Sequence, residues 1–198
     1  MPAKPTPPAA PPRSAARDRL VAAAADVFYA DGIHAVGVDR LIAAAGVTKA
    51  TFYRHFPSKE DLVLAYLRLR DDAIRADIGR AVTAADDPRG QVASVMEWLA
   101  DEVCGPGFRG CPFINAAAEY PDPDHPVRLL VAEHRTWFRD TLAGLLRAAG
   151  HPAPDAGAAS LLLARDGAMV GGYLDGSDAR AVLLRTADAL MAGIGDHG

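Results

Sequence analysis

The stretch AGVTKATFYRHFPSKEDL gathers cationic and hydrogen-bonding side chains onto one short segment of the chain. These residues are Lys49, Tyr53, Arg54, His55 and Lys59. Ammonium and guanidinium groups donate hydrogen bonds to phosphate oxygens, and a guanidinium can also bond the edge of a base. The chemistry that these residue types could perform is therefore noncovalent recognition of a nucleic acid.

Two helix-start signals bound this stretch. Thr48 is a good N-cap for a helix over 49–56. Ser58, followed three residues later by Asp61, resembles a capping box and predicts the start of a long helix. We expect that second helix to run to about residue 84.

The predicted helix over 49–56 has two unlike faces. Successive residues are about 100° apart around a helix, so Phe52 and Phe56 share one face and should be buried. The opposite face then presents Ala50 and Arg54 to solvent.

Two earlier helices are needed to support that face. The pattern predicts one helix from Ser14 to Gly32 and a short one over 38–45, after which Gly46 breaks the chain. Two helices joined by a tight glycine-containing turn form the helix-turn-helix pattern. The second helix of such a pair enters the major groove with its N-terminal half toward the bases.

The outward side chains divide into two predicted roles. Arg54 could donate two hydrogen bonds to guanine, Thr51 could donate or accept, and Ala50 is small enough for close backbone approach. The side chains better placed for phosphates are those of Lys49, Tyr53, His55 and Lys59. The alternative interpretation is a solvated helix face with ordinary surface charges.

The rest of the chain also predicts helices, because it shows no sustained period-two alternation and no internal repeat. Apolar residues recur at helical spacing over 92–103, and further helices are expected over 113–119, 126–149, 156–173 and 178–194. The predicted fold is all-α, with about nine helices.

The composition predicts a division into three parts. Six prolines in the first twelve residues predict a disordered arm over 1–13. We expect a helix-turn-helix DNA-binding domain over 14–60 and an effector-binding and dimerisation domain over 61–198.

Charge is distributed unevenly between these parts. The net charge is −4, yet residues 1–56 carry seven Lys and Arg against four Asp, a balance of +3, which leaves −7 for the remainder. A basic N-terminal portion on an acidic body is what a DNA reader with a separate second domain would show.

Several other classes of protein are disfavoured by the sequence. No apolar run approaches the roughly 18 residues that a membrane span needs, and no secretory signal is visible, so we expect a cytoplasmic protein without membrane contact. Cys104 and Cys111 fit a reducing compartment, and their spacing to histidines matches no zinc motif. No HExxH, GxSxG or phosphate-loop motif is present, so neither an enzyme nor a cofactor is expected.

Residues 17–62 closely resemble the DNA-binding domain of the TetR family of bacterial transcriptional regulators. The resemblance implies a three-helix DNA-binding head, a connecting helix and an all-helical body that binds an effector and dimerises. It also implies which residues lie at the DNA. They are those at the matching family positions: Lys49, Ala50, Thr51, Tyr53, Arg54, His55 and Lys59. Gly37 departs from the family, which often has a threonine there that caps the second helix and reaches a phosphate. That contact is then missing or made by Arg40.

The body offers candidate residues for an unknown small-molecule effector. They are mainly large apolar side chains with a few polar ones: Trp98, Phe113, Asn115, Glu119, His134, Trp137, Phe138, Met169 and Tyr173. A plain packed core is the alternative for each. His134 either bonds a backbone carbonyl or faces the ligand, and the Asn115–Glu119 pair either anchors its helix or gives a pocket polar specificity.

The last two helices carry leucines at consecutive positions, over 161–163 and again over 183–184. Consecutive positions cannot all face one core, so some should face a second copy of the chain. We therefore expect a homodimer that reads a roughly palindromic operator. The predicted function is a ligand-responsive repressor, against the alternatives of an architectural DNA-binding protein without effector or an all-helical enzyme.

Overall fold

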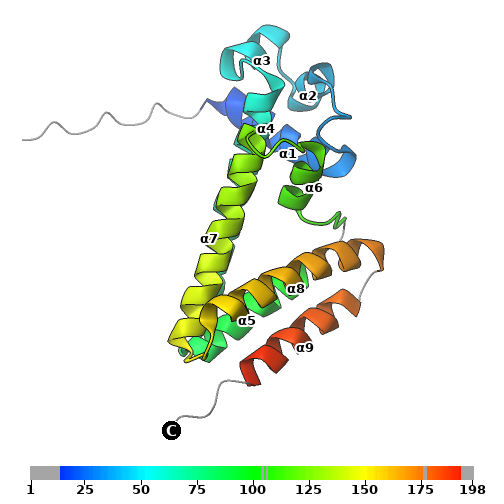
Figure 1. Ribbon diagram of the computed structural model, residues 1–198. Helices are drawn as coiled ribbons and strands as arrows, with labels where there is room; N and C mark the ends of the chain where they lie inside the picture. Colours follow the sequence, from blue (N-terminus) through cyan, green and yellow to red (C-terminus); the bar gives the residue numbers. More distant parts are fainter. Residues whose placement is uncertain (1–13, 104, 106, 176–177, 193–198) are drawn as a thin grey trace, which may run out of the picture.

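The protein is described by a computed structural model that covers residues 14–103, 105, 107–175 and 178–192. Within these residues it has nine helices and no strand, as the sequence predicts. The helices build an elongated molecule with a small head at one end and a larger body at the other (Figure 1).

Three helices form the head: α1 (Ala15–Asp31), α2 (Val38–Ala45) and α3 (Lys49–His55). The predicted cap of α3 is present, because the Thr48 hydroxyl accepts a hydrogen bond from the Thr51 amide at 3.2 Å. The turn between α2 and α3 uses Gly46 at φ +60°, in the left-handed region that glycine tolerates best.

Helix α4 (Lys59–Thr83) belongs to both parts of the molecule. It begins with the predicted capping box, in which Ser58 and Asp61 satisfy each other's backbone amides. Its first turns complete the core of the head, where the Tyr66 ring lies 5.8 Å from the ring of Phe28. Its later turns run down into the body, so one continuous helix joins the head to the body.

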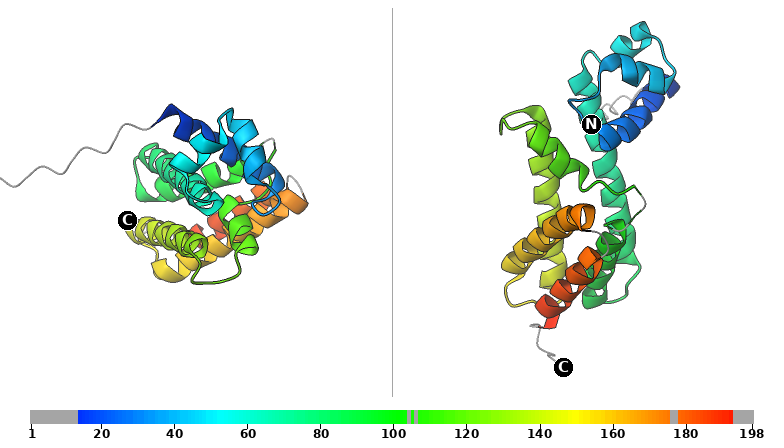
Figure 2. Two further views of the ribbon diagram at one scale, coloured as in Figure 1. Left: turned by 90° about the horizontal axis from the view of Figure 1, so that it is seen from above. Right: turned by 90° about the vertical axis from the view of Figure 1, so that its right-hand side faces the viewer.

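The body consists of α5 (Pro88–Glu102), α6 (Pro112–Glu119), α7 (Pro126–Ala148), α8 (Pro154–Leu174) and α9 (Asp178–Ala192). Helix α7 packs alongside α4, and α8 and α9 lie at the end far from the head (Figure 2). The short helix α6 lies close beneath the head (Figure 1).

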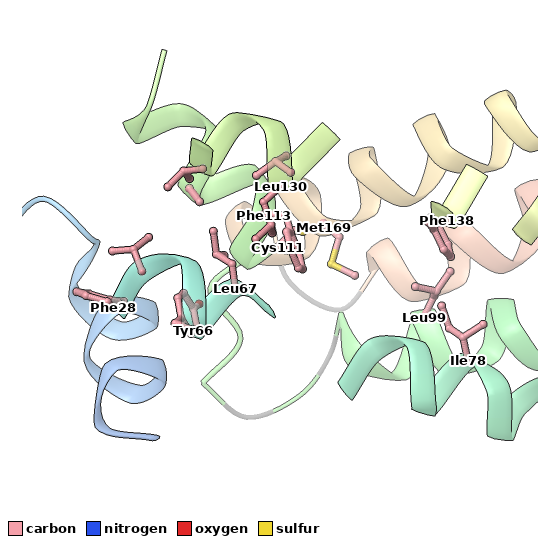
Figure 3. Packing of buried hydrophobic residues seen from close by; sticks show 14 of the residues in the cluster. Phe28, Tyr66, Leu67, Ile78, Leu99, Cys111, Phe113, Leu130, Phe138 and Met169 are labelled. Atoms are coloured by element: carbon pink, nitrogen blue, oxygen red, sulfur yellow. The ribbon is translucent and has the colours of Figure 1, made fainter. Parts of the chain in front are cut away.

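One continuous set of buried apolar side chains runs through both parts. Phe28 and Tyr66 lie at its head end, Phe113 in the middle, and Ile78 with Phe138 deeper in the body (Figure 3). This continuity follows from α4, whose buried side chains serve the head first and then the body.

The helix boundaries differ from the sequence-based ones in a few places. Helix α8 begins at Pro154, before the predicted start at residue 156, because proline is well suited to the first position of a helix. Helix α3 ends at His55, one residue before the predicted end, and Phe56 is its C-cap. The predicted arm over 1–13, Cys104 and the last two residues of the predicted helix 178–194 lie outside the described residues.

Candidate nucleic-acid interface and effector cavity

The outward face of α3 is open to solvent at the tip of the head (Figure 1). Ala50 and Arg54 are exposed, whereas Phe52 is fully buried and Phe56 is 3% exposed. The two faces are therefore arranged as the helical spacing predicts. Among the described helices, α3 packs against α1 and α2, and Ala50 and Arg54 remain exposed.

Two further side chains flank this face. Tyr53 is 46% exposed, and its ring meets the edge of the Phe52 ring at 5.1 Å, which holds it at the boundary between core and solvent. The Thr51 hydroxyl lies 2.9 Å from that of Thr48, so this hydroxyl is already used in the helix cap. Contact of Thr51 with a base stays a prediction, and the methyl group is the part of the side chain that the cap leaves available.

The cations around α2 are engaged in exposed ion pairs. Arg40 bonds Asp31 at 2.6 Å, and the Lys49 ammonium lies 3.7 Å from a carboxylate oxygen of Asp39. Exposed pairs of this kind contribute little free energy, so a phosphate can replace either carboxylate. Gly37 is the exposed N-cap of α2 and supplies no side-chain cap, as its lack of a hydroxyl requires.

His55 and Lys59 are tied to the head more closely than Arg54. The Nε2 atom of His55 lies 3.3 Å from the hydroxyl of Ser14. The Lys59 ammonium lies 5.9 Å from the centre of the Phe28 ring, and partial burial lowers its pKa. Contact of both side chains with the sugar–phosphate backbone stays a prediction.

The body encloses a cavity of about 40 Å³ between α4, α5, α7 and α8. Four of the nine side chains proposed from the sequence line it: Trp98, His134, Phe138 and Met169. Ligand contact remains a prediction for these four.

The other five proposed side chains do not line this cavity. Phe113 stacks on His134 with ring centres 3.7 Å apart, and Trp137 packs under the Arg75 guanidinium at 4.1 Å. Tyr173 is 49% exposed. Each is accounted for by packing or by solvent, without a ligand.

The remaining two, Asn115 and Glu119, anchor α6 to its surroundings. Asn115 donates a hydrogen bond to the backbone oxygen of Arg109 at 2.9 Å. Glu119 accepts hydrogen bonds from the backbone amides of Ile33 at 2.8 Å and His34 at 2.5 Å, in the loop that joins α1 to α2. The anchoring alternative of the sequence analysis is the one favoured.

His134 is bonded to a carboxylate, not to a backbone carbonyl. Its Nδ1 atom lies 2.7 Å from an Asp71 oxygen on α4. Burial lowers the pKa of His134, and the hydrogen bond and charge of Asp71 oppose that shift only in part. The ring is therefore neutral at neutral pH, with Nδ1–H donating to Asp71.

The cavity residues that were not proposed from the sequence include Arg70, Cys111 and Arg165. Arg165 is 5% exposed, although arginine is almost never fully buried unless it is paired. Its position inside the apolar run LLLARDGAMV was the available sign, because a charge in such a run is either at the surface or paired in the core. Nothing comparable marks Arg70, which lies in a charged helix.

Two other features are absent from the part of the chain that the structure describes. No group of three or more His, Cys, Asp and Glu side chains is placed there to hold a metal ion. None of its helices combines the length and apolar character that a membrane crossing requires.

Family models match both parts of the chain. Residues 20–66 match the model described as bacterial regulatory proteins of the tetR family, and residues 89–190 match that of the tetracycline repressor-like C-terminal domain.

Known proteins resemble the chain in sequence and in structure. A TetR-family transcriptional regulator from Streptomyces coelicolor is 45% identical, with a TM-score of 0.88 over 91% of this chain and 96% of that one. A TetR-type regulator from Streptomyces avermitilis is 28% identical, with a TM-score of 0.81 over 90% and 97% of the two chains. The HTH-type transcriptional activator FasR of Mycolicibacterium smegmatis is 36% identical over 46% of this chain.

The alignments with curated relatives are partial. The match spans 41% of FasR, and a match to the HTH-type regulator LmrA of Bacillus subtilis, 27% identical over 57% of this chain, spans 61% of that protein. The chain thus aligns with less than two thirds of the length of each.

Proposed function

This chain belongs to the TetR family of bacterial transcriptional regulators, and we propose that it is a homodimeric repressor that leaves its operator when a small molecule binds the body. It is a DNA-binding transcriptional regulator, and its named relatives are regulators as well. The proposal adds the dimer, the effector and the direction of regulation.

The observation that carries the proposal is the open outer face of α3. Arg54 is exposed there beside the small side chain of Ala50, so the guanidinium can reach a guanine without obstruction from the head. Lys49 is the first residue of α3 and Lys59 the first residue of α4, and both ammonium groups are suited to phosphates. We assign base reading to Arg54, Ala50 and Thr51, and backbone contact to the surrounding donors.

The proposed dimer interface lies on α8 and α9. Leu163, Val170 and Leu174 are 69%, 47% and 69% exposed and recur at helical spacing along one side of α8. Val182 on α9 is 51% exposed. Apolar side chains gathered in this way mark an interaction surface, and a two-fold axis through it would place two heads on one duplex.

Two structural connections support control of the head by the body. Helix α4 carries cavity-lining residues, including Ile74 and Ile78, and the same helix begins in the head. Helix α6 begins with Pro112 at the cavity and ends with Glu119 bonded to the α1–α2 loop. A ligand that favours another position of either helix would also favour another separation of the two heads.

The proposed switch is a shift between two populations of dimers. A dimer whose head spacing matches the operator predominates without ligand, and the ligand binds better to a dimer with another spacing. The effect on DNA affinity cannot exceed the difference in ligand affinity between these states.

Activation is the second candidate for the direction of regulation, because FasR is named an activator. The head would work in the same way in both cases, and the position of the operator relative to the promoter would decide the outcome. An architectural protein is less well supported, since the body holds a cavity that such a protein does not need.

Selection of bound duplexes from a random pool by the full-length protein tests the proposal. We expect a roughly palindromic sequence whose half-sites are centred about 34–36 Å apart or at a similar whole-turn spacing. Retention of no duplex at low salt would contradict the assignment of the α3 face.

Transcription in vitro from a promoter carrying the selected sequence then distinguishes repression from activation. A repressor lowers transcript yield as protein is added. A rise in yield would identify the activator.

A further inference from the structure

The cavity in the body contains a buried cation whose hydrogen bonding is incomplete. We propose that it is an anion-binding site, and that the effector is a small organic carboxylate with a short apolar tail. This inference rests on the proposed ligand-responsive function and names the chemical class of its ligand.

Arg165 is the centre of the site. Its Nη1 donates to an Asp166 oxygen at 2.9 Å, and its Nη2 lies 3.1 Å from the Cys111 sulfur. Its Nε–H has no hydrogen-bond partner, and Nε is the only such buried side-chain nitrogen or oxygen found in the described residues. A buried donor without an acceptor is costly and leaves the guanidinium short of one hydrogen bond, so an anion against the part of Arg165 that lines the cavity would stabilise its charge.

The partners that Arg165 has do not neutralise it. Asp166 is shared, because its other oxygen accepts from Arg135 at 2.6 Å, so one carboxylate serves two guanidinium groups. A thiol is only a weak acceptor, so Cys111 adds little. One positive charge is left over at the cavity wall, in a part of the protein whose overall charge is negative.

The neighbouring charges do not cancel this surplus. Asp71 on α4 is already bonded to His134 and, at 2.8 Å, to Arg75. Glu102 lines the cavity but is exposed, so water screens its charge more effectively than that of the buried guanidinium. The buried end of the site is therefore cationic.

Arg70 provides a second cation at the entrance. It lines both the inner cavity and an adjoining open hollow of about 400 Å³, and it is half-buried. No hydrogen bond or ion pair joins it to another residue in the described part of the chain. Its long-range attraction favours entry of an anion from the hollow.

The size and the walls of the cavity select among anions. A volume of about 40 Å³ is comparable to the space of about three water molecules. A cavity of this size suits a carboxylate group better than a large dianion. Apolar side chains also line the cavity, among them Ile74, Trp98 and Leu99. They favour a ligand with a hydrocarbon part over inorganic phosphate, which has none.

Calorimetric titration of the full-length protein tests the class of ligand directly. The probes are linear carboxylates from acetate to hexanoate, their neutral amides, and inorganic phosphate. We expect the carboxylates to bind, with up to about a fourfold gain per methylene until the tail fills the cavity, and the amides and phosphate to bind far more weakly. Equal binding of butyrate and butyramide would overturn the proposal.

Three variants locate the site on the protein. Arg165→Gln should weaken butyrate binding by at least about tenfold, and Arg70→Gln by a smaller factor of about threefold. The matched control is Arg139→Gln, whose exposed side chain pairs with Asp140 on the surface of α7. If Arg165→Gln does not fold, the Arg70→Gln result decides, since that side chain is only half-buried. Unchanged binding in a folded Arg165→Gln protein, or in Arg70→Gln, would contradict the assignment.

Measurement of operator binding with the same probes separates this inference from the proposed function. Carboxylate binding without any change in DNA affinity would leave the site in place and remove the proposed switch. Release of DNA by a neutral compound, with no carboxylate bound, would leave the switch and remove the anion site.

Discussion

The head and the body use their polar side chains in opposite ways. The seven residues of α3 present their donors outward from a single short helix, so these donors stay in water until DNA arrives. The cavity of the body collects His134, Arg165 and their partners from separate helices and holds them away from water. A substitution in the head can therefore change recognition and leave stability intact, whereas one in the body changes both.

The strongest test of this comparison is a body substitution that acts on DNA binding from a distance. Leu163→Glu places a charge in the proposed α8–α9 interface and should convert the dimer to a monomer. Operator affinity should then fall by about two to four orders of magnitude, because the second half-site no longer benefits from high effective concentration. Ultracentrifugation and gel-shift titration measure the two effects.

Leu129→Glu is the matched control for this substitution. Leu129 is 55% exposed on α7, outside the proposed interface. A dimer that survives Leu163→Glu, or one that Leu129→Glu disrupts equally, would place the interface elsewhere.

A head substitution should give a smaller but more specific loss. Arg54→Ala should relax base preference at one operator position by about 1–3 kcal/mol. The melting temperature should stay close to that of the parent, because the side chain is exposed. Competition gel shifts with single-base operator variants provide the measurement, and an unchanged preference would show that Arg54 does not read a base.

Lys49→Ala should produce a still smaller and uniform effect. Removal of one phosphate contact weakens binding to all sequences alike, and it lowers the slope of log affinity against log salt by about one. Titrations over a range of salt concentrations measure that slope. A loss confined to particular operator variants would instead place Lys49 at a base.

The smallest effect concerns stability and belongs to the body. Because burial lowers the pKa of His134, the unfolded chain binds a proton more readily than the folded one below about pH 6.5. This residue therefore contributes stability above that pH, and the contribution is lost as the pH falls below it. His134→Gln should flatten the decline in unfolding free energy between neutral and mildly acidic pH, measured by denaturant titration. Parallel pH profiles for parent and variant would exclude this contribution.

The head could be predicted closely from the sequence because its determinants are local. The cap of α3 at Thr48, the capping box of α4 and the two faces set by Phe52 and Arg54 depend only on residues a few positions apart. Period and capping chemistry determine such features before any tertiary contact forms.

The cavity could not be predicted in the same way. The bond between His134 and Asp71 joins residues 63 positions apart, and the contact between Arg165 and Cys111 joins residues 54 positions apart. These pairings depend on how α4, α7 and α8 cross, which helical periodicity does not specify. The prediction that large aromatic side chains line the cavity failed in part for the same reason. Tyr173 is exposed to solvent, and Phe113 packs against the ring of His134.

The bond between α6 and the head has a consequence for how this protein can change. Glu119 holds the main chain of residues 33 and 34, and every amino acid except proline offers the same amide. Substitution of the exposed His34 can therefore leave both amide bonds in place, whereas Ile33 is 3% exposed and is also constrained by the core. Position 119 has no such freedom, because aspartate is one methylene too short to span the gap, and glutamine brings one amide oxygen where a carboxylate brings two. Natural or engineered diversity should consequently be broader at position 34 than at position 119.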